Sequence, residues 1–169
     1  MNKKVADIAL IALLACALAG QALAQDSEVE FNSNADDLTK IRSVLEEFRQ
    51  DIIRKDGHAL TKLMLNSNVF FHSIDDQDHV DSARKYNAQF DGVGPSALDG
   101  FATYLSTSKD KIEEKFHNVE IRQDGPLGLV TFNYDFVVND KVTHGGLEVW
   151  QLCKIDGQWK ILSVVWTIR

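Results

Sequence analysis

The sequence is short of cysteine, proline and positive charge. Its 169 residues contain two cysteines and two prolines, and 18 Lys and Arg stand against 25 Asp and Glu for a net charge of −7. Nucleic acid and anionic lipid bind positively charged protein surfaces, and an acidic chain has an unfavourable charge for both, so we expect neither partner. The surplus negative charge serves mainly to keep a small domain in solution.

The first 24 residues have the pattern of a secretory signal peptide. Lys3 and Lys4 form a basic start, "IALIALLACALAG" follows as an apolar core, and Ala22-Leu23-Ala24 fits a cleavage site. An alternative is lipidation, because "LLAC" ending at Cys16 resembles the signal of a lipoprotein. The residues after Cys16 stay apolar and run into the better cleavage site. We therefore expect a periplasmic or secreted product with no membrane attachment after cleavage.

Cleavage after Ala24 would leave 145 residues, the size of one domain with a single core. Cys153 would then be the only cysteine, which excludes an intrachain disulfide. Because it lies in an apolar run, we expect a buried and unreactive thiol.

Helical patterns come first along the mature chain and strand patterns come last. We expect a flexible leader at 25–36, a helix from Asp36 or Asp37 to Gly57, and shorter helices at 58–64 and 97–108. The strands expected are 68–74, 112–123, 128–138, 142–154 and 158–168. Residues 75–96 show no period and are predicted to form a long loop. This order predicts an α+β domain with helices packed on one face of a curved, mainly antiparallel sheet.

Several stretches in this order resemble the nuclear transport factor 2-like superfamily, with the closest likeness to SnoaL-like and ketosteroid-isomerase-like proteins. They are "RKDGHALTKLM", "VFFHSI", "HNVEIRQDG", "LGLVTFNYDF" and "KIDGQWKILSVVW". The resemblance spans about residues 37–168 and implies one domain at 37–169. Its expected form is a cone, in which about three helices lean on a strongly bent sheet with a pocket inside the mouth. Such folds serve both enzymes and binding modules, so the site has to decide the function.

The resemblance also implies where isomerase residues should lie. The base position falls on Ser73, or on His72 if the register slips by one, the tyrosine position falls near Arg49, and the acid position falls near Gln151. None of the three carries the side chain that this chemistry needs. We therefore do not expect an isomerase of the family type.

His72 is the best single candidate for chemistry, because a neutral imidazole can accept or donate a proton near pH 7. The alternative hypothesis to a binding module is an enzyme for proton transfer or hydrolysis that uses His72 with Tyr134 or Asp135. A histidine that is merely hydrogen-bonded at a strand end is the simpler reading of this residue. The acidic stretch 75–81 matches no metal-binding spacing, so neither a metal nor another cofactor is expected.

The favoured hypothesis is a pocket that holds a small apolar or aromatic molecule. The side chains expected to line it are Phe70, His72, Phe132, Tyr134, Phe136, Val149, Gln151, Leu162, Val164 and Trp166. By period two, the residues expected on the outer sheet face are Thr131, Asn133, Asp135, Trp159, Ile161, Ser163 and Val165. An exposed apolar sheet face is a liability, and this surface often joins two subunits in the superfamily, so a homodimer is expected.

Overall fold

The computed structural model describes residues 30–169, and the folded unit comprises Phe31–Arg169. The predicted signal peptide, the alternative lipidation site at Cys16 and residues 25–29 of the predicted leader lie outside the described residues. No helix in the described range is long and apolar enough to cross a membrane.

The elements of this unit are four helices and five strands among residues 30–169. The helices are α2 (Ala35–Arg54), α3 (Gly57–Lys62), α4 (Gln77–Arg84) and α5 (Leu98–Thr107). The strands are β1 (Phe70–Ile74), β2 (Ile112–Asp124), β3 (Leu127–Val138), β4 (Lys141–Ile155) and β5 (Gln158–Thr167). Helices therefore precede the main sheet, as the sequence predicts.

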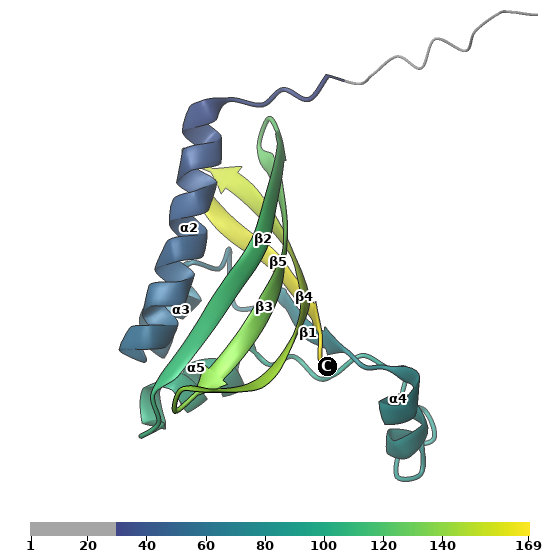
Figure 1. Ribbon diagram of the computed structural model, residues 1–169. Coiled ribbons are helices and arrows are strands. Elements are labelled where there is room, and N and C mark those ends of the chain that lie inside the picture. Colours follow the sequence, from purple (N-terminus) through teal and green to yellow (C-terminus); the bar gives the residue numbers. More distant parts are fainter. Residues whose placement is uncertain (1–29) are drawn as a thin grey trace, which may run out of the picture. The chain divides into compact units, whose positions relative to one another are not determined.

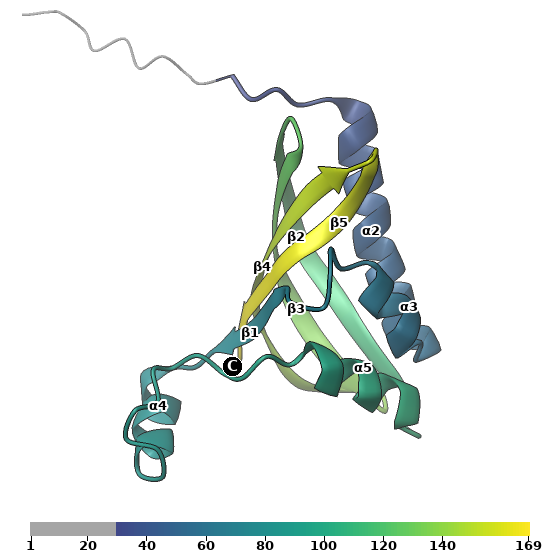
Figure 2. The same cartoon turned by 180° about the vertical axis from the view of Figure 1, so that it is seen from behind.

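The five strands form one sheet in the order β1-β5-β4-β3-β2. All neighbours are antiparallel except β1 and β5, which run parallel. The sheet is strongly bent, with α2 running alongside it and α5 lying across the end opposite the β2–β3 turn (Figures 1 and 2). This arrangement confirms the predicted α+β class.

Helix α2 presents one apolar face to the sheet. Ile41, Leu45, Phe48 and Ile52 repeat at helical spacing and are buried. The helix is capped by the Asn34 side chain, which accepts the Asp37 N–H at 2.8 Å, and not by Asp36 or Asp37 as predicted. The Asp37 carboxylate has other partners. It accepts from Lys154 Nζ at 2.8 Å and from Trp159 Nε1 at 3.0 Å.

Helix α2 ends before the glycine that was expected to close it. Lys55 adopts the left-handed conformation at its C-terminus, with φ of 59°. Gly57 instead begins α3, where a Cβ would lie 2.0 Å from the Ala102 carbonyl oxygen of α5. The glycine is required by the close approach of α3 and α5.

The end of the predicted leader takes part in the fold. The Asn32 carbonyl accepts the Gly125 N–H at 2.8 Å, and the Asn34 N–H donates to the Gln123 side chain at 2.9 Å. The segment preceding α2 is thereby tied to the turn between β2 and β3.

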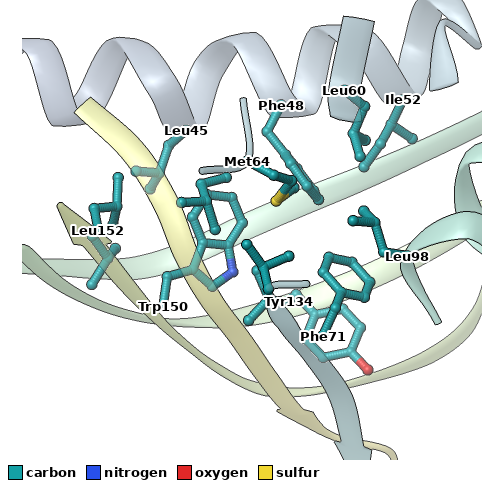
Figure 3. Close-up of a cluster of buried hydrophobic side chains, with 14 of the residues drawn as sticks. Leu45, Phe48, Ile52, Leu60, Met64, Phe71, Leu98, Tyr134, Trp150 and Leu152 are labelled. Carbon is teal, nitrogen blue, oxygen red and sulfur yellow. The ribbon is translucent and has the colours of Figure 1, made fainter. Parts of the chain in front are cut away.

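The core lies between α2 and the concave sheet face, and aromatic rings fill its centre. Phe48 of α2 meets Trp150 of β4 edge to face, with ring centroids 4.8 Å apart (Figure 3). Phe132 packs against Trp150 at 5.3 Å and against Phe116 at 4.3 Å. Trp150 is fully buried, so this cluster holds helix and sheet together.

A bulge in β5 reverses which residues face inward. Gln151 pairs with Ser163 and the next residue, Leu152, pairs with Ile161, so Leu162 has no partner on β4. Trp159 and Ile161 therefore point into the core, although uninterrupted period two predicts them outside. Ser163 and Val165 keep the predicted outer orientation, and they are half-buried.

Strand β4 has the opposite phase from the one expected. Trp150 and Leu152 are fully buried, which places Val149 and Gln151 on the outer face. Cys153 lies on that outer face too and is half-buried, so the predicted burial of this thiol is wrong, while its low reactivity stays a prediction.

The segment predicted as a loop at 75–96 contains helix α4. Asp76 caps it by accepting the His79 N–H at 2.8 Å, and Val80 is its buried residue. The segment leaves the sheet after β1 and returns as Val93 pairs with Ile74. It extends away from the sheet in both views (Figures 1 and 2).

Candidate functional site

A cavity of about 380 Å³ lies between α5 and the concave face of the sheet. Most of its wall is aromatic or aliphatic, and the rings and aliphatic side chains come from α2, from α5 with the residue before it, and from the three strands β1, β3 and β5. They are Phe48, Phe71, Ala97, Phe101, Tyr104, Phe136, Val138 and Trp166. The volume falls within the usual range for small-molecule pockets, roughly 300 to 1,000 Å³.

Two glutamates form the polar floor. Glu114 of β2 and Glu148 of β4 line the cavity and are only 4% and 5% exposed. Glu114 pairs with Phe136 and Glu148 pairs with Phe132, so the two acids flank β3 on its inner face. Their depth contrasts with Tyr104 at the mouth, which is 38% exposed.

Within residues 30–169, the two buried acids form no ion pair with a Lys, Arg or His side chain. Burial raises the pKa of Glu148 to about 8, and the hydrogen bond from Trp150 opposes this effect. Burial and then the charge of Glu148 raise the pKa of Glu114 well above its ordinary value. Desolvation disfavours the carboxylate form, so both side chains hold protons at pH values where exposed glutamates are ionised.

Hydrogen bonds orient the groups around this floor. Trp150 donates its indole N–H to Glu148 Oε2 at 3.1 Å, and the Tyr134 hydroxyl donates to the Thr167 carbonyl at 3.0 Å. Gly146, opposite Tyr134 on β4, permits this contact, since a Cβ there would lie 2.0 Å from the same carbonyl oxygen. Burial, followed by the charges of Glu148 and Glu114, raises the pKa of the Tyr134 phenol, which stays protonated.

His144 and Thr143 form the polar part of the mouth. The His144 ring stacks on Phe136 at 5.0 Å, and its Nδ1 lies 3.1 Å from the Thr143 hydroxyl. Burial lowers the pKa of His144, so the imidazole is neutral at neutral pH.

Comparison with known proteins identifies the fold. No protein-family model matches the sequence, and no curated protein matches it. A cystatin-like protein of unknown function from Nostoc punctiforme superimposes with a TM-score of 0.58 at 14% identity, covering 80% of this chain and 93% of that one. A nuclear transport factor 2-like protein from Cytophaga hutchinsonii gives 0.56 at 15% identity, covering 81% and 100%. A nuclear transport factor 2-like protein of unknown function from Shewanella oneidensis gives a TM-score of 0.55 at 18% identity, covering 78% of this chain and 98% of that one.

The chain has the nuclear transport factor 2-like fold. The predicted likeness is thereby confirmed for the fold. Its cavity carries polar groups at positions other than the three expected from ketosteroid isomerases. Ser73, Arg49 and Gln151 are all absent from the cavity wall, and the acids lie at Glu114 and Glu148 instead.

Of the predicted pocket residues, three line the cavity: Tyr134, Phe136 and Trp166. Phe132 and Val164 face the same side of the sheet but are fully packed in the core. Val149 and Gln151 were assigned to the wrong face of β4, as described above. Leu162 is the unpaired residue of the β5 bulge and lies outside the cavity wall.

Phe70 and His72 lie on the outer side of β1. Phe71 pairs with Val164 and takes the inward position, so its two neighbours must point the other way. Phe70 is 46% exposed, and its ring centroid lies 4.1 Å from that of His72, with the two rings tilted by 31°. His72 Nδ1 lies 2.6 Å from the Gly94 carbonyl oxygen, which is the structural role considered as the simpler reading.

The constellation proposed for an enzyme is not assembled. His72 is outside the cavity, and Asp135 points to the outer face, where its carboxylate lies 3.0 Å from His117 Nε2. Tyr134 alone of the three lines the cavity.

Sequence reasoning missed Glu114, Glu148 and His144, although a signal exists for both acids. Glu114 is in phase with Ile112 and Phe116, and Glu148 is in phase with Trp150 and Leu152. A glutamate that alternates with large apolar residues on one strand face marks a buried acid.

The described residues offer no candidate metal site. No group of three or more His, Cys, Asp and Glu residues in the range 30–169 is placed to hold an ion. The acidic residues at 75–81 lie in and around α4, where Asp76 serves as a helix cap.

Proposed function

We propose that this chain is an exported small-molecule-binding domain that holds an apolar or aromatic ligand in the cavity between α5 and the sheet. The observation that carries the proposal is the cavity itself, about 380 Å³ with aromatic walls and a floor of two acids. Apolar walls with a few convergent polar groups are the usual make-up of a ligand pocket. Export rests on the sequence pattern of residues 1–24.

Binding should depend on Trp166, which faces the cavity beside Phe71. The two rings meet edge to face at 5.1 Å. A panel of aromatic and steroid-like compounds is screened by intrinsic fluorescence, and affinities are measured by titration calorimetry. Trp166→Ala should weaken a binder by about 1 to 3 kcal/mol, because a large apolar contact is lost.

Phe70→Ala provides the matched control, since it removes an aromatic ring from the outer side of the same sheet. It should leave the affinity within twofold of wild type. Equal losses in both variants would mean that the compound binds elsewhere, and the cavity would not be the site. Absence of binding across the whole panel would count against the proposed function.

A second candidate function is an enzyme, and one observation favours it. Burial raises the pKa of Glu148 to about 8 on the floor of the cavity, and a carboxyl poised near neutral pH suits general acid–base catalysis. Product analysis of each bound compound by mass spectrometry separates the two functions. Turnover that Glu148→Gln abolishes, with binding retained, would replace the binding module by an enzyme.

The homodimer is proposed from the outer sheet face. Leu129 and Leu147 are 37% and 39% exposed there, and Val149 and Val165 pair side by side between them. An apolar sheet face of this kind is commonly covered. Light scattering of wild type and of Leu147→Lys tests the proposal. A monomeric wild-type protein would overturn it.

A further inference from the structure

We propose that the ligand class is a protonated amine, held by Glu114 and Glu148 through its ammonium group and by the aromatic walls through its apolar body. This inference rests on the proposed function, because it names the ligand chemistry of the same cavity. Three observations support it: the carboxyl oxygens on the floor have few hydrogen-bond donors, residues 30–169 place no positive charge beside them, and aromatic rings line the walls.

The carboxyl oxygens have too few donors within the protein. Glu114 has no hydrogen-bond partner among residues 30–169, although it is only 4% exposed and faces the cavity. Glu148 accepts from Trp150 through Oε2, and its Oε1 has no partner in the described range. These oxygens are accessible from the cavity, since Asp51 Oδ2 is the fully buried side-chain atom that lacks a partner in the described residues, so a molecule in the cavity can reach them. Three oxygens that share one cavity floor match the three N–H donors of an ammonium group.

The floor also lacks positive charge from the protein. None of the ion pairs in the part of the chain that the structure describes includes Glu114 or Glu148. No Lys or Arg is among the residues that line the cavity. Buried charges in proteins are paired, so a cation from outside is what would stabilise these carboxylates.

The walls indicate an organic cation and not a metal ion. Hard metal ions bind several oxygen ligands, and the described residues offer no group of three or more suitable side chains. The rings of Phe71, Phe136 and Trp166 face the cavity. Aromatic faces attract cations within about 6 Å of the ring centre and also bury an apolar skeleton.

A neutral carbonyl ligand is the competing class. Protonated carboxyls would donate to it, but Tyr134, the other hydroxyl on the floor, already donates to the Thr167 carbonyl. A carbonyl oxygen has two lone pairs and would accept from both protonated acids, so the aldehyde probe below tests this class directly. An ammonium group can bind to both acids, and its charge stabilises the carboxylate that forms when one of them releases its proton.

The experiment compares three matched probes on each of several ring skeletons. Each skeleton is used as its aminomethyl, hydroxymethyl and aldehyde derivative, for example on naphthalene, and dissociation constants are measured at pH 7.5. We expect the amine to bind wild type about ten- to a hundredfold more tightly than the alcohol, which corresponds to charge-assisted hydrogen bonds. In Glu114→Gln and Glu148→Gln this preference should shrink, while the alcohol keeps its affinity.

Calorimetry in two buffers of different ionisation heat gives an independent readout on wild-type protein. The titratable groups on the cavity wall are Glu114, Glu148, Tyr134, Tyr104 and His144. At pH 7.5 the amine is charged, His144 is neutral and the Tyr134 phenol is protonated. Binding of the ammonium should therefore release a carboxyl proton to the buffer, and binding of the alcohol should release none.

The outcomes separate this inference from the proposed function. Equal affinities for amine and alcohol, tighter binding of the aldehyde, or no proton release would overturn the amine class and leave a neutral-ligand pocket. Failure of all probes on every skeleton would overturn the binding function as well, and the amine inference with it. An amine preference that survives both glutamine substitutions would place its site outside this floor.

Discussion

At the scale of single residues, the cavity depends on side chains that are small as much as on those that are large. Gly146 lets the backbone of Thr167 approach β4, and the carbonyl of Thr167 receives the Tyr134 hydroxyl. Tyr134 is thereby fixed with its hydroxyl turned to the backbone. The two acids are then the polar groups on the floor that remain for a ligand.

Gly146→Ala should destabilise the fold and disturb the floor. The added Cβ would lie 2.0 Å from the Thr167 carbonyl oxygen, so the backbone must shift. Overpacking of this kind costs about 1 to 3 kcal/mol, to be measured by urea unfolding. Gly100→Ala is the control, because no atom lies within 4 Å of its added Cβ in helix α5. It should be neutral or stabilising. Equal effects of the two substitutions would refute the close approach at Gly146.

At the scale of elements, the sequence predicts which segments are helices and strands better than it predicts their faces. The helix starting near residue 36 and the four long strands occur within a few residues of their predicted limits, because apolar period and turn residues act locally. The inward position of Trp159 and Ile161 on β5 depends on a bulge at Leu162, which no local pattern marks. On β4 the alternation is unbroken from Glu148 to Leu152, and the wrong choice of its inner face is the reason that the floor acid Glu148 was missed.

The candidate site was predictable only where apolar residues alternate without a break along a strand. Phe132, Tyr134 and Phe136 lie on one unbroken stretch of β3, and period two placed all three correctly on the inner face. To predict Glu114 and Glu148 on the inner face, charged residues would have to be placed in the interior, whereas acids are normally assigned to the solvent side. Helix α4 escaped prediction because it buries Val80 alone, which gives no apolar period to detect.

Asp37 joins three elements, so its removal should loosen the end of the sheet remote from the cavity. Its carboxylate on α2 receives Lys154 of β4 and Trp159 of β5. Asp37→Ala should lower the melting temperature more than Asp37→Asn, which keeps an acceptor for Trp159. Asp36→Ala is the control, because its side chain is 76% exposed. A melting temperature unchanged in Asp37→Ala would show that the contact contributes nothing to stability.

At the scale of the whole molecule, the two kinds of buried carboxyl act on stability in opposite pH ranges. Hydrogen bonds lower the pKa of Asp37 to about 2, and the one from Lys154 makes the largest contribution. Its contribution is present above the ordinary pKa and is lost as the pH falls towards 2. Glu114 and Glu148 have raised pKa values, so the folded state holds protons that the unfolded chain has released. Their effect is loss of stability as the pH rises.

The unliganded protein should therefore be most stable in mildly acidic solution. Between the ordinary glutamate pKa of 4.5 and the value of about 8 for Glu148, each rise in pH favours the unfolded chain, which binds fewer protons. We expect the free energy of unfolding to fall by roughly a few kcal/mol from pH 5 to pH 8. Urea unfolding at pH 5, 6.5 and 8 measures this decline. The decline should be reduced in Glu114→Gln and Glu148→Gln and unchanged in Glu120→Gln, an exposed residue of the same strand as Glu114. A wild-type stability that rises from pH 5 to pH 8 would mean that the floor acids are ionised in the folded protein, contrary to their burial.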